Sequence, residues 1–205
     1  HLLYDQHFQW RGSVEPPGNV VLVFMDDKSA IELERMHGRW SRNQTAKALH
    51  NLCRAGAEII GLDMVMTARD SNPEEDRRLA DAIRKCNNVV LGRISATPTT
   101  DGRKSLKIFR EGMIGEGFID VPLDSDNVWR RLNYFNARPL SDGSLEIIPA
   151  FALELVRTYL YLDYTVKEKG DDYFILGDPS KENHILLPKP ELMINFFGSY
   201  SVFES

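Results

Sequence analysis

The chain has 205 residues, of which 42% are apolar, and a formal net charge of -5 at pH 7. This length and apolar content suffice to bury a normal core as one large domain or as one and a half small ones. The 25 basic residues form no long block, so the composition argues against nucleic acid as a partner. No run of about twenty apolar residues is present, so no segment of the sequence is expected to span a membrane.

The first part of the chain, residues 1–18, joins the segment HLLYDQHFQWRG to the turn-like string EPPG. We interpret it as a lead-in helix and linker that deliver the chain to a domain covering residues 19–205. The aromatic and basic side chains suit a membrane interface, and a packed N-terminal arm is equally consistent with them. Because the chain begins at His1 rather than Met, we interpret it as a piece excised from a longer protein.

Strand and helix patterns alternate between residues 19 and 94. The strings VVLVFM and IIGLDMVM predict two strands, and helical spacing of apolar residues over 43–53 predicts the helix between them. Asn72-Pro73 predicts the start of a second helix, which ends at Asn87, and VVLGRI predicts a third strand covered on both faces. This order predicts a βαβαβ unit with parallel strands.

Shorter elements are expected downstream. The pattern predicts a short strand at 106–109, then β-rich runs at 117–121 and 128–135 with a hairpin-like connection. Pro149 opens a largely buried helix that runs to Leu162, and DYFILGD, HILLP and ELMINFFG predict three more strands. The predicted fold is therefore α/β, a three-layer sandwich with a mixed, largely parallel β-sheet built on an N-terminal βαβαβ unit.

Two sets of side chains are interpreted as structural. Cys53 and Cys86 fall on apolar helix faces and are expected to be small buried hydrophobes, while a single disulfide in an oxidising compartment stays open. Asp126 with Arg130 and Arg131 is expected to form a turn and a surface ion pair of little energetic weight.

Candidate binding residues gather at the carboxyl ends of the predicted strands, which is where ligands bind in open α/β sheets. A pocket there would suit a polar or cationic small molecule, or a divalent cation held by carboxylate oxygens. The candidates are Asp26, Asp27, Lys28, Ser29, Arg42, Asp63, Thr67 and Arg93.

Each candidate also has an ordinary structural explanation. Asp27 would cap the helix that begins near Ser29, and Asp63 would pair with Arg42. Arg93 would be solvated at the end of its strand. The residue types alone do not choose between the two explanations.

A set of strings occurs along the chain in a fixed order. They are VVLVFMDDKSA, Trp40-Ser41-Arg42, AGAEIIGLDMVM, PEEDRRLADAIRKCNNVVLG, GFIDVPLDSDNVWRRL, PAFALELV and LMINFFGS. In this order they resemble the CHASE2 domain, the extracytoplasmic sensory module of bacterial receptors, over about residues 19–199. One string departs from the family, whose members usually carry a Trp-Pro-Trp-Pro-Arg-like string before the first helix. Here HGRWSRNQ keeps only Trp40 and Arg42 of it.

The resemblance implies a sensor rather than an enzyme. Such a domain lies on the periplasmic or extracellular side of an inner or plasma membrane receptor, between transmembrane helices. It would regulate a cytoplasmic nucleotide cyclase, diguanylate cyclase, serine/threonine kinase or two-component histidine kinase. The signal would be a small molecule or a protein, and no cofactor or metal is expected. Signalling would switch the chain ends between two arrangements, so the N-terminal helix and the C-terminal strand are expected to lie close together.

Two other classes of function stay open. A metal-dependent hydrolytic or phosphoryl-transfer enzyme would use Asp26, Asp27 and Asp63, although the chain has no phosphate-cradling glycine loop, GxSxG elbow or HExxH helix. A structural or dimerising element, as in a homodimer, would instead use an exposed apolar patch. That patch would comprise Phe196, Phe197, Tyr200 and Phe203.

Overall fold

The computed structural model describes residues 2–16, 18–32, 40–96, 100, 102–139, 142–143, 145–181 and 183–196. The chain divides into two compact units. The terminal unit combines His1–Arg35 with Ile194–Ser205, and the central unit is Met36–Met193. Among the described residues, no helix has both the length and the apolar character needed to cross a membrane.

Helices and strands alternate along both units. The helices are α1 (Leu2–Arg11), α2 (Asp27–Glu32), α3 (Arg42–Arg54), α4 (Pro73–Cys86), α5 (Lys107–Arg110) and α6 (Phe151–Tyr159). The first five strands are β1 (Ile60–Leu62), β2 (Val89–Arg93), β3 (Gly115–Phe118), β4 (Arg131–Leu132) and β5 (Phe135–Pro139). The remaining strands are β6 (Leu145–Pro149), β7 (Val166–Lys169), β8 (Tyr173–Gly177), β9 (His184–Pro188) and β10 (Leu192–Met193).

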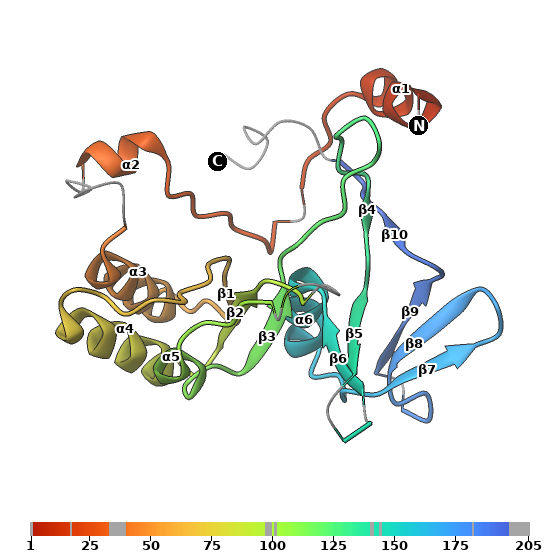
Figure 1. The fold of residues 1–205 in the computed structure, drawn as a ribbon. Coiled ribbons are helices and arrows are strands. Elements are labelled where there is room, and N and C mark those ends of the chain that lie inside the picture. Colours follow the sequence, from red (N-terminus) through yellow and green to blue (C-terminus); the bar gives the residue numbers. More distant parts are fainter. Residues whose placement is uncertain are drawn as a thin grey trace. The chain divides into compact units, whose positions relative to one another are not determined.

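A parallel sheet of three strands, in the order β1-β2-β3, forms the middle of the central unit (Figure 1). Ile60 lies opposite Val89 in the first pair, and Val90 lies opposite Gly115 in the second. Helix α4 connects β1 to β2, as a parallel crossover requires. The predicted parallel pairing of these strands and the helix between them are confirmed.

Helices α3 and α4 pack side by side on one face of this sheet (Figure 1). Side chains alternate across a strand, so every second residue of β1 and β2 points into this contact. The core formed here contains Leu49, Ile60, Leu62, Leu79, Ile83, Val89, Leu91 and Phe109. Both helices begin at a capping side chain: Asn72, the predicted cap, accepts a hydrogen bond from the Glu74 amide, and Ser41, which was not predicted, accepts one from the Asn43 amide.

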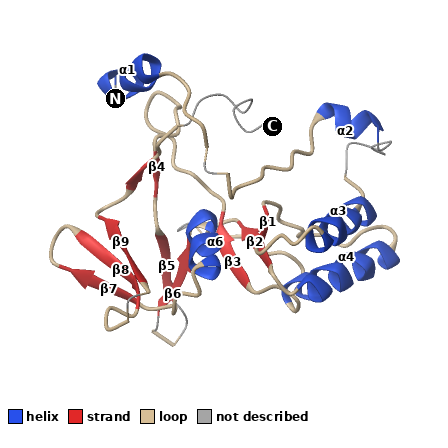
Figure 2. Cartoon of the chain, turned by 180° about the vertical axis from the view of Figure 1, so that it is seen from behind, coloured by secondary structure: helices blue, strands red, loops and turns tan. Residues whose placement is uncertain are grey.

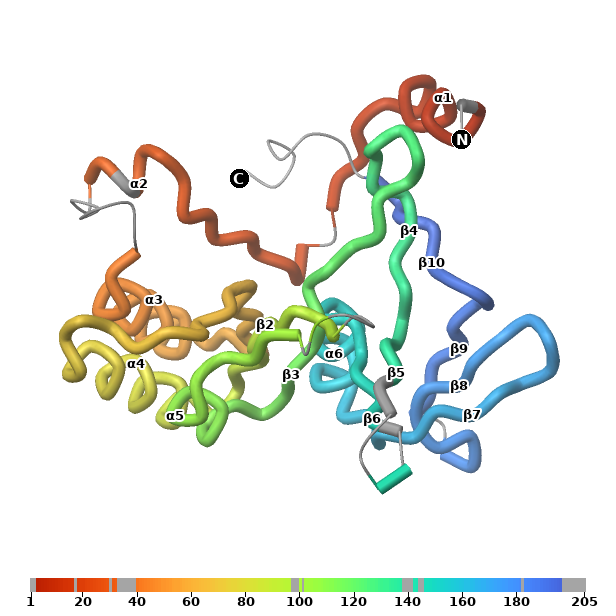
Figure 3. Tube along the Cα trace, in the orientation of Figure 1, coloured from red at the N-terminus to blue at the C-terminus, as the bar shows by residue number. Residues whose placement is uncertain are grey.

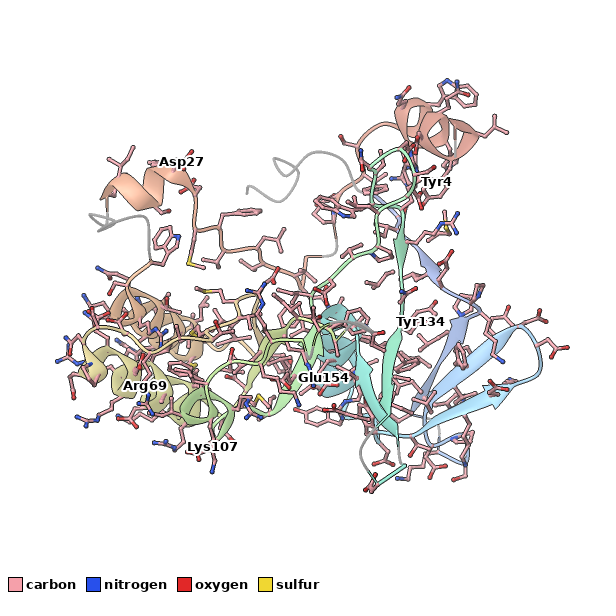
Figure 4. The ribbon with its side chains drawn as sticks, in the orientation of Figure 1. Tyr4, Asp27, Arg69, Lys107, Tyr134 and Glu154 are labelled. Carbon is pink, nitrogen blue, oxygen red and sulfur yellow. A yellow bond between two sulfur atoms is a disulfide. The ribbon has the colours of Figure 1, made fainter. Side chains whose placement is uncertain are left out.

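Helix α6 covers the opposite face, which is lined by glycines. A Cβ atom on Gly117 would lie 2.5 Å from the Cα of Phe151. A Cβ atom on Gly61 would lie 3.0 Å from the Cζ atom of the Phe151 ring. Glu154, labelled in Figure 4, extends from α6 onto Gly115 and is buried, with Arg157 donating two hydrogen bonds to its carboxylate. The missing side chains let α6 approach the sheet closely.

Antiparallel strands account for the rest of the β-structure, seen from behind in Figure 2. Strands β5 and β6 pair, β7, β8 and β9 form a second sheet, and β10 pairs with β4. A second core lies here, with Phe118, Tyr134, Ile148, Ala150, Leu153, Leu162, Leu176 and Leu187. The mixed α/β class is therefore confirmed, while the expectation of one largely parallel sheet is wrong in the described residues.

The predicted first strand is not observed. Residues 20–25 form neither helix nor strand, and Figure 3 shows them as an extended trace. All six side chains, from Val20 to Met25, are exposed. A strand needs a neighbour to complete its hydrogen bonds, and no described strand pairs with this segment. The βαβαβ unit is reduced to the single βαβ of β1, α4 and β2.

Two further local predictions are wrong. Residues 107–110 form helix α5 instead of a strand, because a helical turn after Leu106 places Phe109 fully in the core. The runs at 117–121 and 128–135 do not pair as a hairpin, since β3 pairs with β2 and β4 pairs with β10. Sequence patterns reveal strands more readily than they reveal which strands pair.

Helix α6 is confirmed but is less buried than expected. Val156 and Tyr159 are exposed, while Leu153 and Glu154 are buried. Helix packing on a single sheet face leaves the outer side of the helix in solvent.

The two sets of side chains interpreted as structural also differ from expectation. Cys53 and Cys86 form a disulfide with a Cα–Cα distance of 5.8 Å, so the option that the sequence left open is the one realised. Arg130 is not a surface residue, because only 1% of it is exposed. Its guanidinium donates to Asp124 and twice to Asp126, and these bonds hold the turn before β4. The pKa of Asp126 is lowered to about 2 by the hydrogen bond from Arg130.

We expect Gly117→Ala to lower the free energy of unfolding by about 1–3 kcal/mol, because the new Cβ would meet the α6 backbone. Chemical denaturation would measure the loss. Gly18→Ala is the matched control, since nothing lies within 4 Å of the Cβ built at Gly18. Equal stability of the two variants would contradict the close packing of α6 against the sheet.

We expect the double variant Cys53→Ser/Cys86→Ser to lose about 3–4 kcal/mol of stability, because the bond closes a loop over a sequence separation of 33. Thermal melts of wild type and variant, each with and without reductant, would measure this. Reductant should lower the melting temperature of the wild type and leave that of the variant unchanged. A wild-type melt insensitive to reductant would show that the bond contributes nothing.

Candidate functional site

The candidates from the first predicted strand lie in the terminal unit, where they serve a helix end. The backbone amide of Ser29 donates to Asp26 Oδ1 at 2.8 Å, so Asp26, rather than Asp27, caps α2. The hydrogen bonds from Ser29 lower the pKa of Asp26 below its ordinary value. Asp27 is the first residue of the helix and is exposed.

A pocket of about 250 Å³ lies in the central unit, between the start of α3 and the loop that follows β1. Two predicted candidates, Arg42 and Thr67, line it. The full lining consists of Trp40, Arg42, Thr45, Met64, Val65, Met66, Thr67, Ala68 and Asp70. The loop continues from the carboxyl end of β1, which is the side of the sheet where the sequence placed the site.

The loop wall of the pocket is fixed by backbone hydrogen bonds. The amide of Met66 donates to Ser105 Oγ at 3.1 Å, and the carbonyl of Met66 accepts from the Leu106 amide at 2.8 Å. The Met66 side chain is buried in the core beneath α3 and α4. The loop therefore holds its shape without a ligand.

Arg42 is the central group of the wall. It is only 8% exposed, and its two terminal nitrogens donate to Asp76 Oδ1 and to the carbonyl of Ala68. Its guanidinium also lies over the ring of Phe109, 5.0 Å from the centroid. The prediction that Arg42 pairs with Asp63 is therefore wrong. Arg42 instead binds the buried carboxylate of Asp76, in the first turn of α4.

Asp70 is the carboxylate of the pocket lining. Its Oδ1 accepts from the Asn72 amide at 2.9 Å, and its own amide donates to Asp76 Oδ2 at 3.2 Å. Its Oδ2 lies 3.9 Å from Arg42 Nε, which is too far for a hydrogen bond. Its Oδ2 therefore accepts no hydrogen bond from a described residue, and Asp70 shares the pocket lining with Trp40 and Thr67.

The other two candidates of the central unit do not line this pocket. Asp63 is exposed, and no described residue donates to it or pairs with it. Partial desolvation of its carboxyl group raises its pKa above the ordinary value. Arg93 lies at the end of β2 and is only 2% exposed, so the expectation that it is solvated is wrong.

Arg93 belongs to a buried ion-pair network. Its Nη1 lies 3.3 Å from Glu116 Oε2 and 3.2 Å from Glu146 Oε1, and Lys104 Nζ lies 3.1 Å from the same Glu146 oxygen. Its Nε and Nη2 have no hydrogen-bond partner in the described part of the chain. Burial alone would raise the pKa of Glu146, but hydrogen bonds from Lys104 and Arg93 outweigh it and lower the pKa.

Comparison with known proteins identifies the family. The family model of the CHASE2 domain matches residues 1–204. The chain belongs to the CHASE2 family. Neither a curated protein nor a solved structure matches it. CHASE2 domains are extracytoplasmic sensory domains of signalling receptors, and they are typically not catalytic.

Three polar or aromatic groups of the CHASE2 pocket were not proposed as ligand contacts from the sequence. Trp40 lies in a string that carries the family resemblance, while Thr45 and Asp70 carry no such signal. The string Asp70-Ser71-Asn72-Pro73 is an Asx-type turn into α4 and would have drawn attention to Asp70. Within the described ranges, no group of three His, Cys, Asp or Glu side chains could hold a metal ion.

We expect the stabilising effect of Glu146 to depend on pH. Because its pKa is lower when folded than when unfolded, its contribution is present above the ordinary glutamate pKa of about 4.3 and is lost as the pH falls through the folded value. The gap in melting temperature between wild type and Glu146→Gln should therefore be largest near neutral pH and shrink in acid. Thermal melts across this range would measure the gap, and a gap that grows in acid would contradict the network.

Proposed function

We propose that this CHASE2 domain is the ligand-sensing part of a bacterial transmembrane receptor. The signal is a small molecule bound in the pocket between α3 and the loop after β1. The domain lies between transmembrane helices of the full-length receptor and regulates a cytoplasmic cyclase, diguanylate cyclase or kinase. The disulfide between Cys53 and Cys86 suits an oxidising, extracytoplasmic location.

The observation that carries this proposal is a contact between the two ends of the domain, within the terminal unit. The Tyr4 hydroxyl on α1 donates to the carbonyl of Ile194. Arg11 donates to Asn195 Oδ1 at 2.6 Å and to the carbonyl of Phe196. We call this contact between α1 and residues 194–196 the terminal clamp.

An aromatic contact completes the terminal clamp. The ring of Phe8 meets that of Phe196 edge-to-face, with centroids 5.4 Å apart, and Arg11 lies over Phe8 at 4.7 Å. Such edge-to-face and cation–π contacts each contribute about 1 kcal/mol. The other members of the expected aromatic patch, Phe197, Tyr200 and Phe203, lie outside the described residues.

The terminal clamp is suited to transmit a signal. Residues 194–196 directly follow β10, which pairs with β4, and Arg131 of β4 binds Glu191 at 2.6 Å just before β10. A ligand that favours one arrangement of the central unit would shift β10 and the residues 194–196 that follow it. The terminal clamp would then transmit this shift to the flanking helices. Only a difference in ligand affinity between the two arrangements can drive the shift.

We expect Phe8→Ala to shift the basal output of the full-length receptor by about fivefold, because it removes the edge-to-face contact with Phe196, the Phe8 contact that joins the two chain ends and contributes about 1 kcal/mol. The readout is the activity of the receptor's own cytoplasmic enzyme, assayed in membranes at equal receptor abundance. Gln9→Ala on the same helix is the matched control, since Gln9 is exposed and should leave the output unchanged. Equal output from wild type and both variants would overturn the proposed route through the clamp.

A further inference from the structure

We infer that the pocket between α3 and the loop after β1 takes a small organic cation, an amine with a short apolar body. This inference rests on the proposed sensory function and names the chemistry of its ligand. It follows from the charges, the hydrogen bonds and the shape of the pocket wall.

Arg42 lines the pocket with Asp70 and is also paired with Asp76, a buried residue outside the lining, so two carboxylates share this one cation. Arg42 supplies one positive charge, and the carboxylates of Asp76 and Asp70 both face it. Asp76 takes the guanidinium, while the open oxygen of Asp70 is left 3.9 Å from it. Arg69 lies on the same loop but is exposed and does not line the pocket. A ligand with a positive charge would complete this balance.

The cationic side chain of the pocket lining, Arg42, is already hydrogen-bonded from both terminal nitrogens, which disfavours an anionic ligand. Arg42 donates from both terminal nitrogens to Asp76 and Ala68. The Asn43 amide at the start of α3 donates to Ser41 and Glu75, and the Met66 amide donates to Ser105. An anion drawn to Arg42 would have to displace Asp76 or the Ala68 carbonyl from its terminal nitrogens, whereas an ammonium group would meet the open oxygen of Asp70.

The rest of the wall suits the apolar body of such a ligand. Met64, Val65 and Met66 contribute aliphatic and thioether surface, and Trp40 contributes an indole, the aromatic side chain that attracts cations most strongly. A pocket of about 250 Å³ has room for a molecule of a few carbon atoms. The Thr67 hydroxyl can accept a second hydrogen bond from the ammonium group.

Tryptophan fluorescence tests this assignment with three probes of matched size. Trp10 and Trp129 are exposed, so Trp10→Phe/Trp129→Phe leaves Trp40 as the only reporter without disturbing the core. This variant would be titrated with n-butylammonium, n-butanol and butyrate at constant ionic strength. We expect a saturable change with n-butylammonium, binding weaker by about tenfold for n-butanol, and no change with butyrate.

Two carboxylate variants locate the charge that is recognised. Asp70→Asn should weaken n-butylammonium binding by about tenfold and leave n-butanol binding unchanged, which would also show that the pocket still folds. Asp63→Asn is the matched control, because Asp63 follows β1 directly but does not line the pocket. It should leave all three titrations unchanged.

The outcomes separate the ligand class from the sensory function. Stronger binding of butyrate or n-butanol than of n-butylammonium would overturn the inference that the ligand is a cation. The pocket would remain a binding site. Loss of n-butylammonium binding in Asp63→Asn but not in Asp70→Asn would overturn the site. If no probe changes Trp40 fluorescence, the inference fails, while the terminal clamp is still judged by the output of the full-length receptor.

Discussion

The buried guanidinium of Arg42 is the interaction on which the central unit depends most. It ties α3 to α4 through Asp76, holds the loop after β1 through the carbonyl of Ala68, and packs on Phe109 of α5. Removing one partner of a buried ion pair is strongly destabilising, because it leaves an uncompensated buried charge. The same requirement that fixes these elements therefore also fixes one wall of the pocket.

Close packing on the other face of the sheet complements this network. Gly61 and Gly117 bring α6 against the strands, and Glu154 is buried where the helix meets Gly115. The parallel sheet is consequently packed on both faces. Apolar side chains fill the α3 and α4 side, and on the α6 side the helix lies close to the backbone of the strands. The loop after β1 is supported by this sheet, so the binding proposed for it would not require the loop to change its geometry.

In the proposed mechanism the two units have different roles. The pocket belongs to the central unit, and the terminal clamp belongs to the terminal unit. Covalent connection through β10 joins them, since Met193 ends that strand and Ile194 begins the clamp. The clamp consists of a few hydrogen bonds and aromatic contacts, which suits an element that has to change between two arrangements at small energetic cost.

The sequence by itself determined the local elements and the family. The cap at Asn72 and the apolar runs of β1 and β2 depend on near neighbours in the chain, so their patterns were sufficient. The tertiary structure decided what depends on distant partners. These features are the pairing of β3 with β2 and of β4 with β10, the helical turn at Phe109, the partner of Arg42, and the disulfide. It also placed Arg42 and Thr67 at one pocket and left Asp63 and Arg93 outside it. The physical reason is that a local pattern reports the conformation and the burial of a residue, whereas the identity of its partner is set by packing between segments far apart in the chain.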